Sequence, residues 1–184
     1  MNKELEDLKL KIYSTLETPN DLSKYMQENI EYKWMDQDGN LHDKITSDMY
    51  TTYSMMSPQE VIYHSAGICV DQVGLERDWF SLQKYYHEVL CIQIFREDSA
   101  PGHTFLIYCD DDKWYWFENS WYTYRGIHCY GSRDSLISDI RSKFIDQNNI
   151  LDSELEKIKI KPFPIYPIHS SYEQMDKYDL GKRK

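Results

Sequence analysis

The sequence lacks a long hydrophobic run and has few cysteines. No apolar run of about 18 residues, the length that crosses a bilayer, occurs in it. Its start, MNKELEDLKLKIY, has no apolar stretch behind a basic end, which argues against a secretion signal. The four cysteines, Cys69, Cys91, Cys109 and Cys129, lie far apart without a Cys-x-x-Cys pair. We therefore expect a soluble cytoplasmic protein with free thiols, no disulfide framework, no zinc site and no cofactor.

Positive charge is also scarce. The 184 residues contain 21 Lys and Arg against 31 Asp and Glu, a formal net charge of −10. Such a chain repels phosphate backbones, and its basic residues are scattered except for Lys182-Arg183-Lys184, so we do not expect nucleic-acid binding. Aromatic residues are abundant, however: 16 Tyr, 5 Trp and 6 Phe indicate a globular protein with a large core.

We predict one α+β domain in three consecutive parts. Residues 1–56 form a helical N-terminal part, residues 57–146 form the core, and residues 147–184, which contain three prolines, run extended over the surface as a wrapping tail. Apolar residues three and four apart, together with capping residues, predict helices at 2–17, 18–29, 57–65, from 69, and from 132. In the helix from 69, the predicted apolar stripe is Leu75, Trp79, Leu82 and Tyr86.

The periodicity changes at Val89. The runs VLCIQIF, HTFLIYC and KWYWFENSW are rich in β-branched and aromatic residues, which predicts three strands, and the last two are separated only by three aspartates. We expect these two strands to form a hairpin. Because KWYWFENSW is aromatic on both faces, we also expect it to be covered on both sides.

The stretch GICVDQ makes Cys69 a candidate nucleophile. A thiol becomes a good nucleophile when a helix N-terminus and an imidazole favour its thiolate, and Cys69 is at a predicted helix start. His103 opens one strand of the predicted hairpin, whereas Glu118 and Asn119 close the other. A hairpin brings these ends together, so His103 should lie beside the Glu118-Asn119 pair, which could orient the imidazole.

This order of residues resembles the transglutaminase-like branch of the papain-like fold. The resemblance covers about residues 57–122 and rests on GICVD, on the His-led HTFLIY and on the Trp-rich WYWFENSW. It implies a nucleophile helix packed on an antiparallel sheet, with Cys69 as nucleophile, His103 as its partner and Glu118 as the orienting acid, where the family usually has aspartate. It further implies a cysteine-dependent peptidase, amidase or acyltransferase that acts on a protein, a peptide or a small acyl donor.

The orienting residue stays open between two neighbours. The papain peptidases have an asparagine followed by Ser-Trp, and Asn119-Ser120-Trp121 is similar. A hairpin loop of two or four residues puts His103 and Glu118 on the same face, whereas a loop of three puts His103 and Asn119 together. We favour Glu118, because a carboxylate stabilises an imidazolium more strongly than an amide does and because the spacing in the family points there.

Several other interpretations are weaker. A binding module that keeps the fold without its chemistry is the main alternative function, and an acidic nucleic-acid mimic ranks last because the acids are distributed along the chain. His64 could serve as the base, but it fits better as a structural histidine. Cys91, Cys109 and Cys129 are expected to be structural. The segment Asp36–Asn40 lacks the distal glutamate of a calcium loop.

Overall fold

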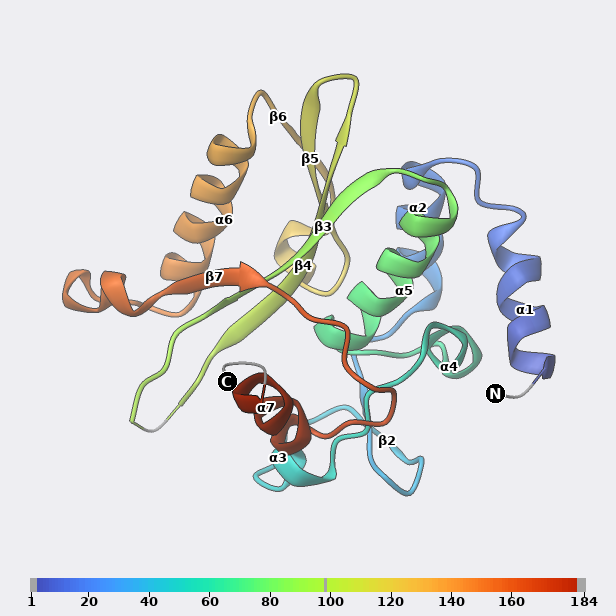
Figure 1. Cartoon of the computed structure of the whole chain (residues 1–184), viewed down its shortest axis with the longest axis horizontal. Coiled ribbons are helices and arrows are strands. Elements are labelled where there is room, and N and C mark those ends of the chain that lie inside the picture. Colours follow the sequence, from blue (N-terminus) through green and yellow to red (C-terminus); the bar gives the residue numbers. More distant parts are fainter. Residues whose placement is uncertain (1–2, 98, 182–184) are drawn as a thin grey trace.

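The computed structural model describes residues 3–97 and 99–181 (Figure 1), and the basic residues at 182–184 lie outside this part. The helices are α1 (Lys3–Tyr13), α2 (Pro19–Asn29), α3 (Met49–Thr52), α4 (Pro58–His64), α5 (Cys69–Leu82), α6 (Arg133–Gln147) and α7 (Tyr172–Gly181), with 3-10 turns η1 (Tyr122–Tyr124) and η2 (Asp152–Lys157). The strands are β1 (Trp34–Met35), β2 (Leu41–His42), β3 (Tyr86–Gln93), β4 (Gly102–Asp110), β5 (Lys113–Glu118), β6 (Gly126–Tyr130) and β7 (Lys159–Pro162).

A five-stranded antiparallel sheet, in the order β6-β5-β4-β3-β7, divides the molecule into layers. Helix α5 packs on one face and α6 on the other (Figure 1). Strand β5 contributes to both cores: buried Phe117 belongs to the cluster that contains α5, and buried Trp116 belongs to the cluster that contains α6. The predicted α+β class and the covering of this strand on both sides are therefore confirmed.

The β4–β5 hairpin has a two-residue turn. Asp110 pairs with Lys113, and Asp111 and Asp112 between them have positive φ angles of 47° and 60°. This pair of left-handed residues matches the twist of a tight hairpin, which aspartate tolerates better than most residues do. Leu106 pairs with Phe117, and since side chains alternate, His103 and Glu118 share the opposite face.

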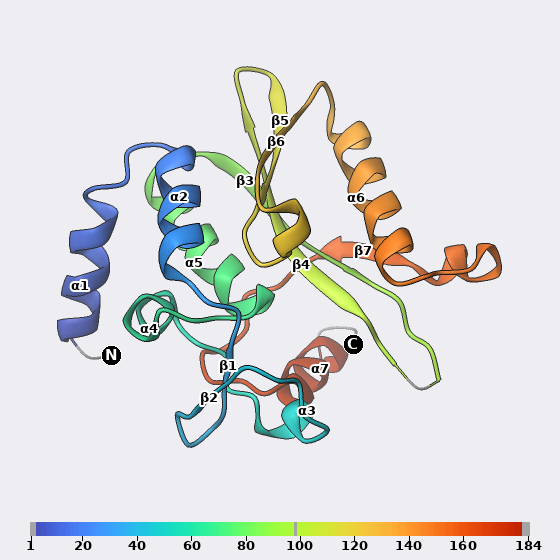
Figure 2. The same cartoon turned by 180° about the vertical axis from the view of Figure 1, so that it is seen from behind.

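The N-terminal and C-terminal segments meet near the start of α5. Strands β1 and β2 form a small hairpin, and α3 contacts α7 beside it, as both cartoon views show (Figures 1 and 2). The Asp36 carboxylate accepts hydrogen bonds from Asn40 and from the backbone of Asp38, so it closes its own turn. Residues of β1, β2, α3 and α7 line one cavity together with Cys69, so this region borders the start of α5.

Two predictions about buried residues are wrong. Helix α5 ends at Leu82, which is exposed, and Tyr86 already belongs to β3 and is exposed as well. Between them, Lys84 has a positive φ of 63°, which no helix can continue through. Cys129 is exposed on β6, so it is not the buried structural cysteine we expected, whereas Cys91 and Cys109 are half-buried.

The tail is only partly extended. After η2 it supplies β7, which pairs with β3 at the edge of the sheet, and then the helix α7, which the sequence did not predict. Ile158, Tyr166 and Met175 are buried, so this segment contributes to the core rather than only covering it. Pro162 ends β7, and prolines 164 and 167 fall between β7 and α7, where the chain is irregular.

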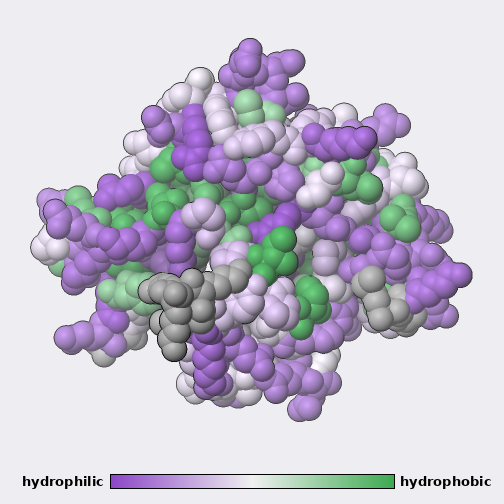
Figure 3. Space-filling model, in the orientation of Figure 1, coloured by the Kyte–Doolittle hydropathy of each residue, from purple (hydrophilic) through white to green (hydrophobic). Residues whose placement is uncertain are grey.

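The face of the molecule seen in Figure 3 is mostly hydrophilic. Figure 3 shows hydrophobic side chains as separate patches within a largely polar face. Of the helices in the described part of the chain, none is both long and apolar enough to span a bilayer.

Candidate active site

The loop before α5 holds Cys69 at the first position of the helix. A Cβ atom on Gly67 would meet the Asp71 Cβ at 3.0 Å and the Gln72 Cγ at 3.4 Å, so the close fold of this loop over the first helical turn requires glycine there. The Asp71 carboxylate accepts a 3.0 Å hydrogen bond from the backbone of Ile68, which satisfies a free N–H at the start of the helix. Gly67 and Asp71 thus fix the position of the thiol.

Asp71 is fully buried and anchors this turn to the N-terminal region. Its Oδ1 accepts hydrogen bonds from the Tyr53 hydroxyl at 2.6 Å and from the Met56 backbone at 2.8 Å. Burial raises the pKa of Asp71 to about 7, although these hydrogen bonds work in the other direction. Its role is therefore structural: it binds three donors from the loops that surround Cys69.

His103 and Glu118 form a close pair at the end of the sheet. His103 Nε2 lies 2.7 Å from Glu118 Oε2, and the carboxylate is almost completely buried. The other oxygen, Oε1, accepts hydrogen bonds from the Trp121 backbone at 2.7 Å and from the Ser120 hydroxyl at 3.2 Å. Glu118 is thus held by its own loop and directed at the imidazole.

The charges of this pair support each other. Burial alone would lower the pKa of His103, but the Glu118 charge and a side-chain hydrogen bond with Cys69 raise it to about 10. Burial would likewise raise the pKa of Glu118, yet the His103 charge and the hydrogen bonds to its oxygens lower it. Both shifts therefore favour the charged forms, an imidazolium at His103 and a carboxylate at Glu118.

His103 also links the carboxylate to Cys69. Because Nε2 faces Glu118, Nδ1 is the ring nitrogen left for the thiol. The Cys69 side chain lies within interaction range of His103, which completes a row of three residues. The ring is held from the side by Trp121, whose centroid is 5.0 Å away in an edge-on arrangement, and by Phe105. The structure thus brings together all three residues that the sequence singled out.

Asn119 has a different partner. Its Nδ2 donates a 2.7 Å hydrogen bond to Gln72 Oε1, and Gln72 Nε2 donates one of 2.6 Å to the carbonyl oxygen of Gly67. The strand alternation that turns Glu118 toward His103 turns Asn119 toward α5. Asn119 and Gln72 therefore connect the hairpin to the loop before Cys69, while Glu118 is the partner of His103.

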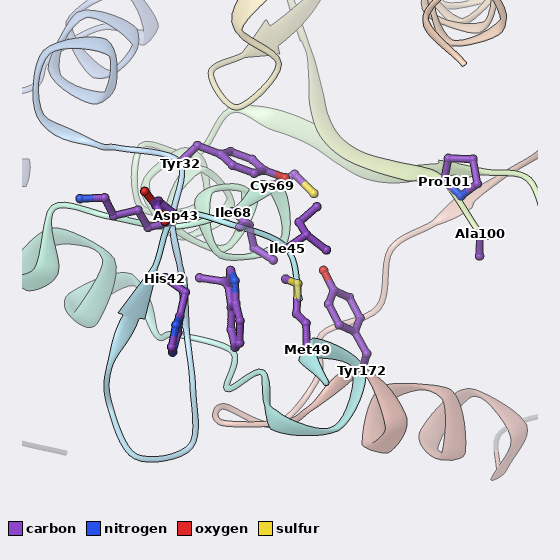
Figure 4. A pocket seen from close by; sticks show the side chains of 13 residues that line it. Tyr32, His42, Asp43, Ile45, Met49, Ile68, Cys69, Ala100, Pro101 and Tyr172 are labelled. Atoms are coloured by element: carbon purple, nitrogen blue, oxygen red, sulfur yellow. The ribbon is translucent and has the colours of Figure 1, made fainter. Parts of the chain in front are cut away.

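A cavity of about 400 Å³ opens in front of Cys69 (Figure 4). Its walls combine Tyr32, Trp34 and Met49 with Tyr172 of α7, and the loop before β4 closes another side. Sequence reasoning missed these residues, because they come from segments that are distant in the chain. The alternation of Ile30, Tyr32 and Trp34 is the one signal that points Tyr32 to the interior.

The other candidate residues lie elsewhere. His64 lines a separate cavity together with His169 and Glu60, not the one that contains Cys69. His128 hydrogen-bonds the Tyr124 carbonyl oxygen through Nε2. In the part of the chain that the structure describes, no group of three or more His, Cys, Asp and Glu side chains has the arrangement of a metal site.

The arrangement combines a thiol at a helix start, an imidazolium in contact with it and a buried carboxylate behind the imidazolium. These are the components that nucleophilic catalysis by cysteine requires, and the cavity leaves room for a substrate next to the sulfur. No family model matches this chain, and no curated protein matches it either.

Proposed function

We propose that the protein is a cysteine-dependent acyl-transfer enzyme with a papain-like, transglutaminase-like core, which acts on an amide or an ester. The row Cys69, His103 and Glu118 carries this proposal, above all the 2.7 Å contact between His103 and the buried Glu118. A buried carboxylate that only stabilised the fold would need no histidine between it and a cysteine that lines a cavity. Here that histidine also contacts the one cysteine that lines the cavity among the described residues.

The reaction begins with attack of the Cys69 thiolate on the carbonyl carbon of the substrate. A C–S bond forms, and the carbonyl electron pair moves onto oxygen, where the backbone N–H of Cys69 can stabilise the negative charge. The oxyanion then collapses and the bond to the leaving amine or alcohol breaks while His103 gives that group its proton. The product of this half-reaction is a thioester on Cys69, and neutral His103 is left beside it.

The second half-reaction returns the enzyme to its starting state. His103 accepts a proton from the acyl acceptor, which attacks the thioester carbon, and the C–S bond breaks to give back the thiolate. Glu118 stabilises the imidazolium each time it forms. Water as acceptor makes the enzyme a peptidase or amidase, and an amine makes it a transglutaminase or acyltransferase. The acyl donor in this proposal is a protein, a peptide or a small acyl compound.

Alkylation with iodoacetamide at neutral pH tests the central claim, because a thiolate in an ion pair reacts faster than an ordinary thiol. Cys129 is an internal control, since it is exposed and has no imidazole partner among its described contacts. Peptide mass spectrometry should find that Cys69 reacts at least ten times faster than Cys129, and that His103→Gln removes this advantage. Equal rates at the two cysteines would refute the proposed chemistry and favour a binding module with this fold.

A substrate test follows from the same chemistry. Chromogenic amides and esters, offered with water or with a primary amine as acceptor, should give a covalent adduct of Cys69 with the mass of the acyl group. Cys69→Ala should give none, while Cys129→Ala should behave like the wild type.

A further inference from the structure

Tyr32 lies beside Cys69 although 37 positions separate them in the sequence. Its neighbour Glu31 forms a parallel bridge with Ala66: the Glu31 N–H donates to the Ser65 carbonyl at 2.9 Å, and the Gly67 N–H donates to the Glu31 carbonyl at 3.0 Å. These two hydrogen bonds attach the segment before β1 directly to the loop that precedes Cys69. The backbone of Tyr32 is therefore fixed relative to the thiol.

The side chain of Tyr32 reaches the reacting atoms. Figure 4 shows its hydroxyl directed at the sulfur of Cys69. The hydroxyl interacts with both the side chain and the backbone N–H of Cys69. When a carbonyl carbon is bonded to this sulfur, its oxygen can lie near the same backbone N–H, because an N–H in the first turn of α5 has no acceptor within the helix. The Tyr32 hydroxyl is thus at the place where negative charge develops.

The hydroxyl remains a donor at this position. Negative charge on Cys69 and burial raise the pKa of Tyr32 well above the usual range of tyrosine, so the proton stays on the phenol. A protonated hydroxyl can donate a hydrogen bond to a thiolate before attack and to an oxyanion after it. From this position the Tyr32 hydroxyl can therefore stabilise both the thiolate and the oxyanion.

We propose that Tyr32 is a catalytic residue that donates a hydrogen bond to the oxyanion of the tetrahedral intermediate, together with the backbone N–H of Cys69. This inference rests on the proposed acyl-transfer function. During attack, the C–S bond forms and the carbonyl electron pair moves to oxygen, and the Tyr32 O–H turns from the sulfur to this oxygen without giving up its proton. When the leaving group departs, the electron pair returns to the carbonyl and the hydroxyl is free again.

Tyr172 provides a matched control. Its hydroxyl also points into the cavity, and burial together with negative charge on Cys69 raises its pKa too. Among the described residues, however, its ring stacks on Tyr53 and its hydroxyl makes no hydrogen bond to Cys69. The two tyrosines therefore share the cavity and differ in their contact with the thiol. Phenylalanine at either position removes one oxygen and keeps the ring, so the fold should tolerate both changes.

The experiment compares acylation with alkylation of Cys69 in the wild type, Tyr32→Phe and Tyr172→Phe. Acylation by a chromogenic ester passes through an oxyanion, whereas alkylation by iodoacetamide does not. Loss of one oxyanion donor should slow acylation by about 100-fold at saturating ester, with little change in KM. Alkylation in Tyr32→Phe should stay within a few-fold of the wild type. Tyr172→Phe, which removes the other cavity hydroxyl, should slow acylation far less than Tyr32→Phe does.

Three results would overturn the assignment of Tyr32. Unchanged or faster acylation in Tyr32→Phe would mean that the hydroxyl only blocks the thiol, and equal losses of acylation and alkylation would mean that it only supports the thiolate. An equal loss of acylation in Tyr172→Phe would mean a general effect of cavity polarity. In all three cases wild-type Cys69 still reacts faster than Cys129, which separates this failure from failure of the acyl-transfer proposal itself. Melting temperatures of the two variants should match that of the wild type, which checks the fold.

Discussion

The helices α5 and α6 pack on opposite faces of the same sheet but bury different kinds of side chain. The buried residues of α6 are Leu136, Ile140 and Phe144, all of them apolar. The buried residues of α5 include Asp71, Gln72 and Glu76 beside its apolar side chains. Buried polar groups cost free energy unless they are hydrogen-bonded, so a helix that serves only packing has no need of them.

The two helices therefore have different roles: α6 mainly stabilises the fold, whereas α5 also positions the residues of the site. Asp71 and Gln72 hold the loop that carries Cys69 and connect it to the hairpin that carries His103. Helix α6 presses on the face of β4 and β5 that bears Phe105 and Trp116. We therefore expect changes under α6 to alter mainly the free energy of unfolding, and changes along α5 and the hairpin end to alter mainly the chemistry.

The largest effect is expected from Phe144→Ala, which leaves a cavity under α6 where Phe144 is almost fully buried. Such a substitution costs about 3–5 kcal/mol of the free energy of unfolding. Urea denaturation measures this loss, and the alkylation rate of Cys69 in the remaining folded protein should equal that of the wild type. The exposed Leu82 on α5 gives a control, because Leu82→Ala should change stability by less than about 0.5 kcal/mol. A slower Cys69 in folded Phe144→Ala would contradict the separation of roles.

Glu118→Gln should instead affect the chemistry. Without the carboxylate charge, the pKa of His103 should fall from about 10 toward its usual value of 6.5, because burial already lowers it. The imidazolium is then lost at a lower pH, and acyl transfer to an amide substrate at neutral pH should slow by roughly 100-fold. An NMR titration of the His103 ring measures the pKa without relying on activity.

Asn119→Ala is the matched control for Glu118→Gln. It removes the neighbouring side chain, which binds Gln72 and not His103, so the titration of His103 should keep its midpoint near pH 10. A midpoint that moved in Asn119→Ala and stayed in Glu118→Gln would show that the asparagine orients the imidazole.

The sequence predicted the local parts of the site and missed its distant parts. The three aspartates at 110–112 allowed hairpin loops of two, three or four residues. The observed pairing of Asp110 with Lys113 excludes the loop of three and puts Glu118 on the face of His103. Sequence alone could not choose, because aspartate tolerates turn and strand-end positions alike. The preference for Glu118 came from charge and from the spacing in a known family, and the pairing agrees with it.

The predicted apolar stripe through Tyr86 was wrong because a local pattern matched by chance. Apolar residues continued with helical spacing past Leu82, but Lys84 takes a left-handed conformation, and the spacing at Tyr86 is a coincidence of the next strand. Tyr32 and Tyr172 were missed for another reason: chain segments 140 residues apart line one cavity, and no local pattern records such a meeting. Nonlocal packing thus determines the cavity, while local patterns determine the helix that carries Cys69.

The smallest effect is expected at Glu76, a buried carboxyl group on α5 that lowers the stability of the fold as the pH rises. Glu76 is two turns after Cys69, almost fully buried, and within electrostatic reach of Glu118, His103 and Cys69. Burial raises its pKa well above the usual 4.5, and the Glu118 charge adds to this rise. The folded protein therefore binds a proton at Glu76 that the unfolded chain releases above pH 4.5, so this residue contributes full stability only in acid and loses it as the pH rises.

Glu76→Gln keeps the shape and removes this proton equilibrium. Near pH 4 the variant and the wild type should be about equally stable, and above pH 4.5 the variant should gain about 1.4 kcal/mol over the wild type for each pH unit, up to the pKa in the folded state. Urea denaturation at closely spaced pH values between 4 and 7 measures this slope. Glu156→Gln, at an exposed position on η2, is the control for a surface substitution and should change the free energy of unfolding by less than about 0.5 kcal/mol. If the difference in free energy of unfolding between Glu76→Gln and the wild type did not change with pH, the Glu76 carboxylate would be ionised in the folded protein and compensated by His103. Helix α5 would then carry its charges without loss of stability.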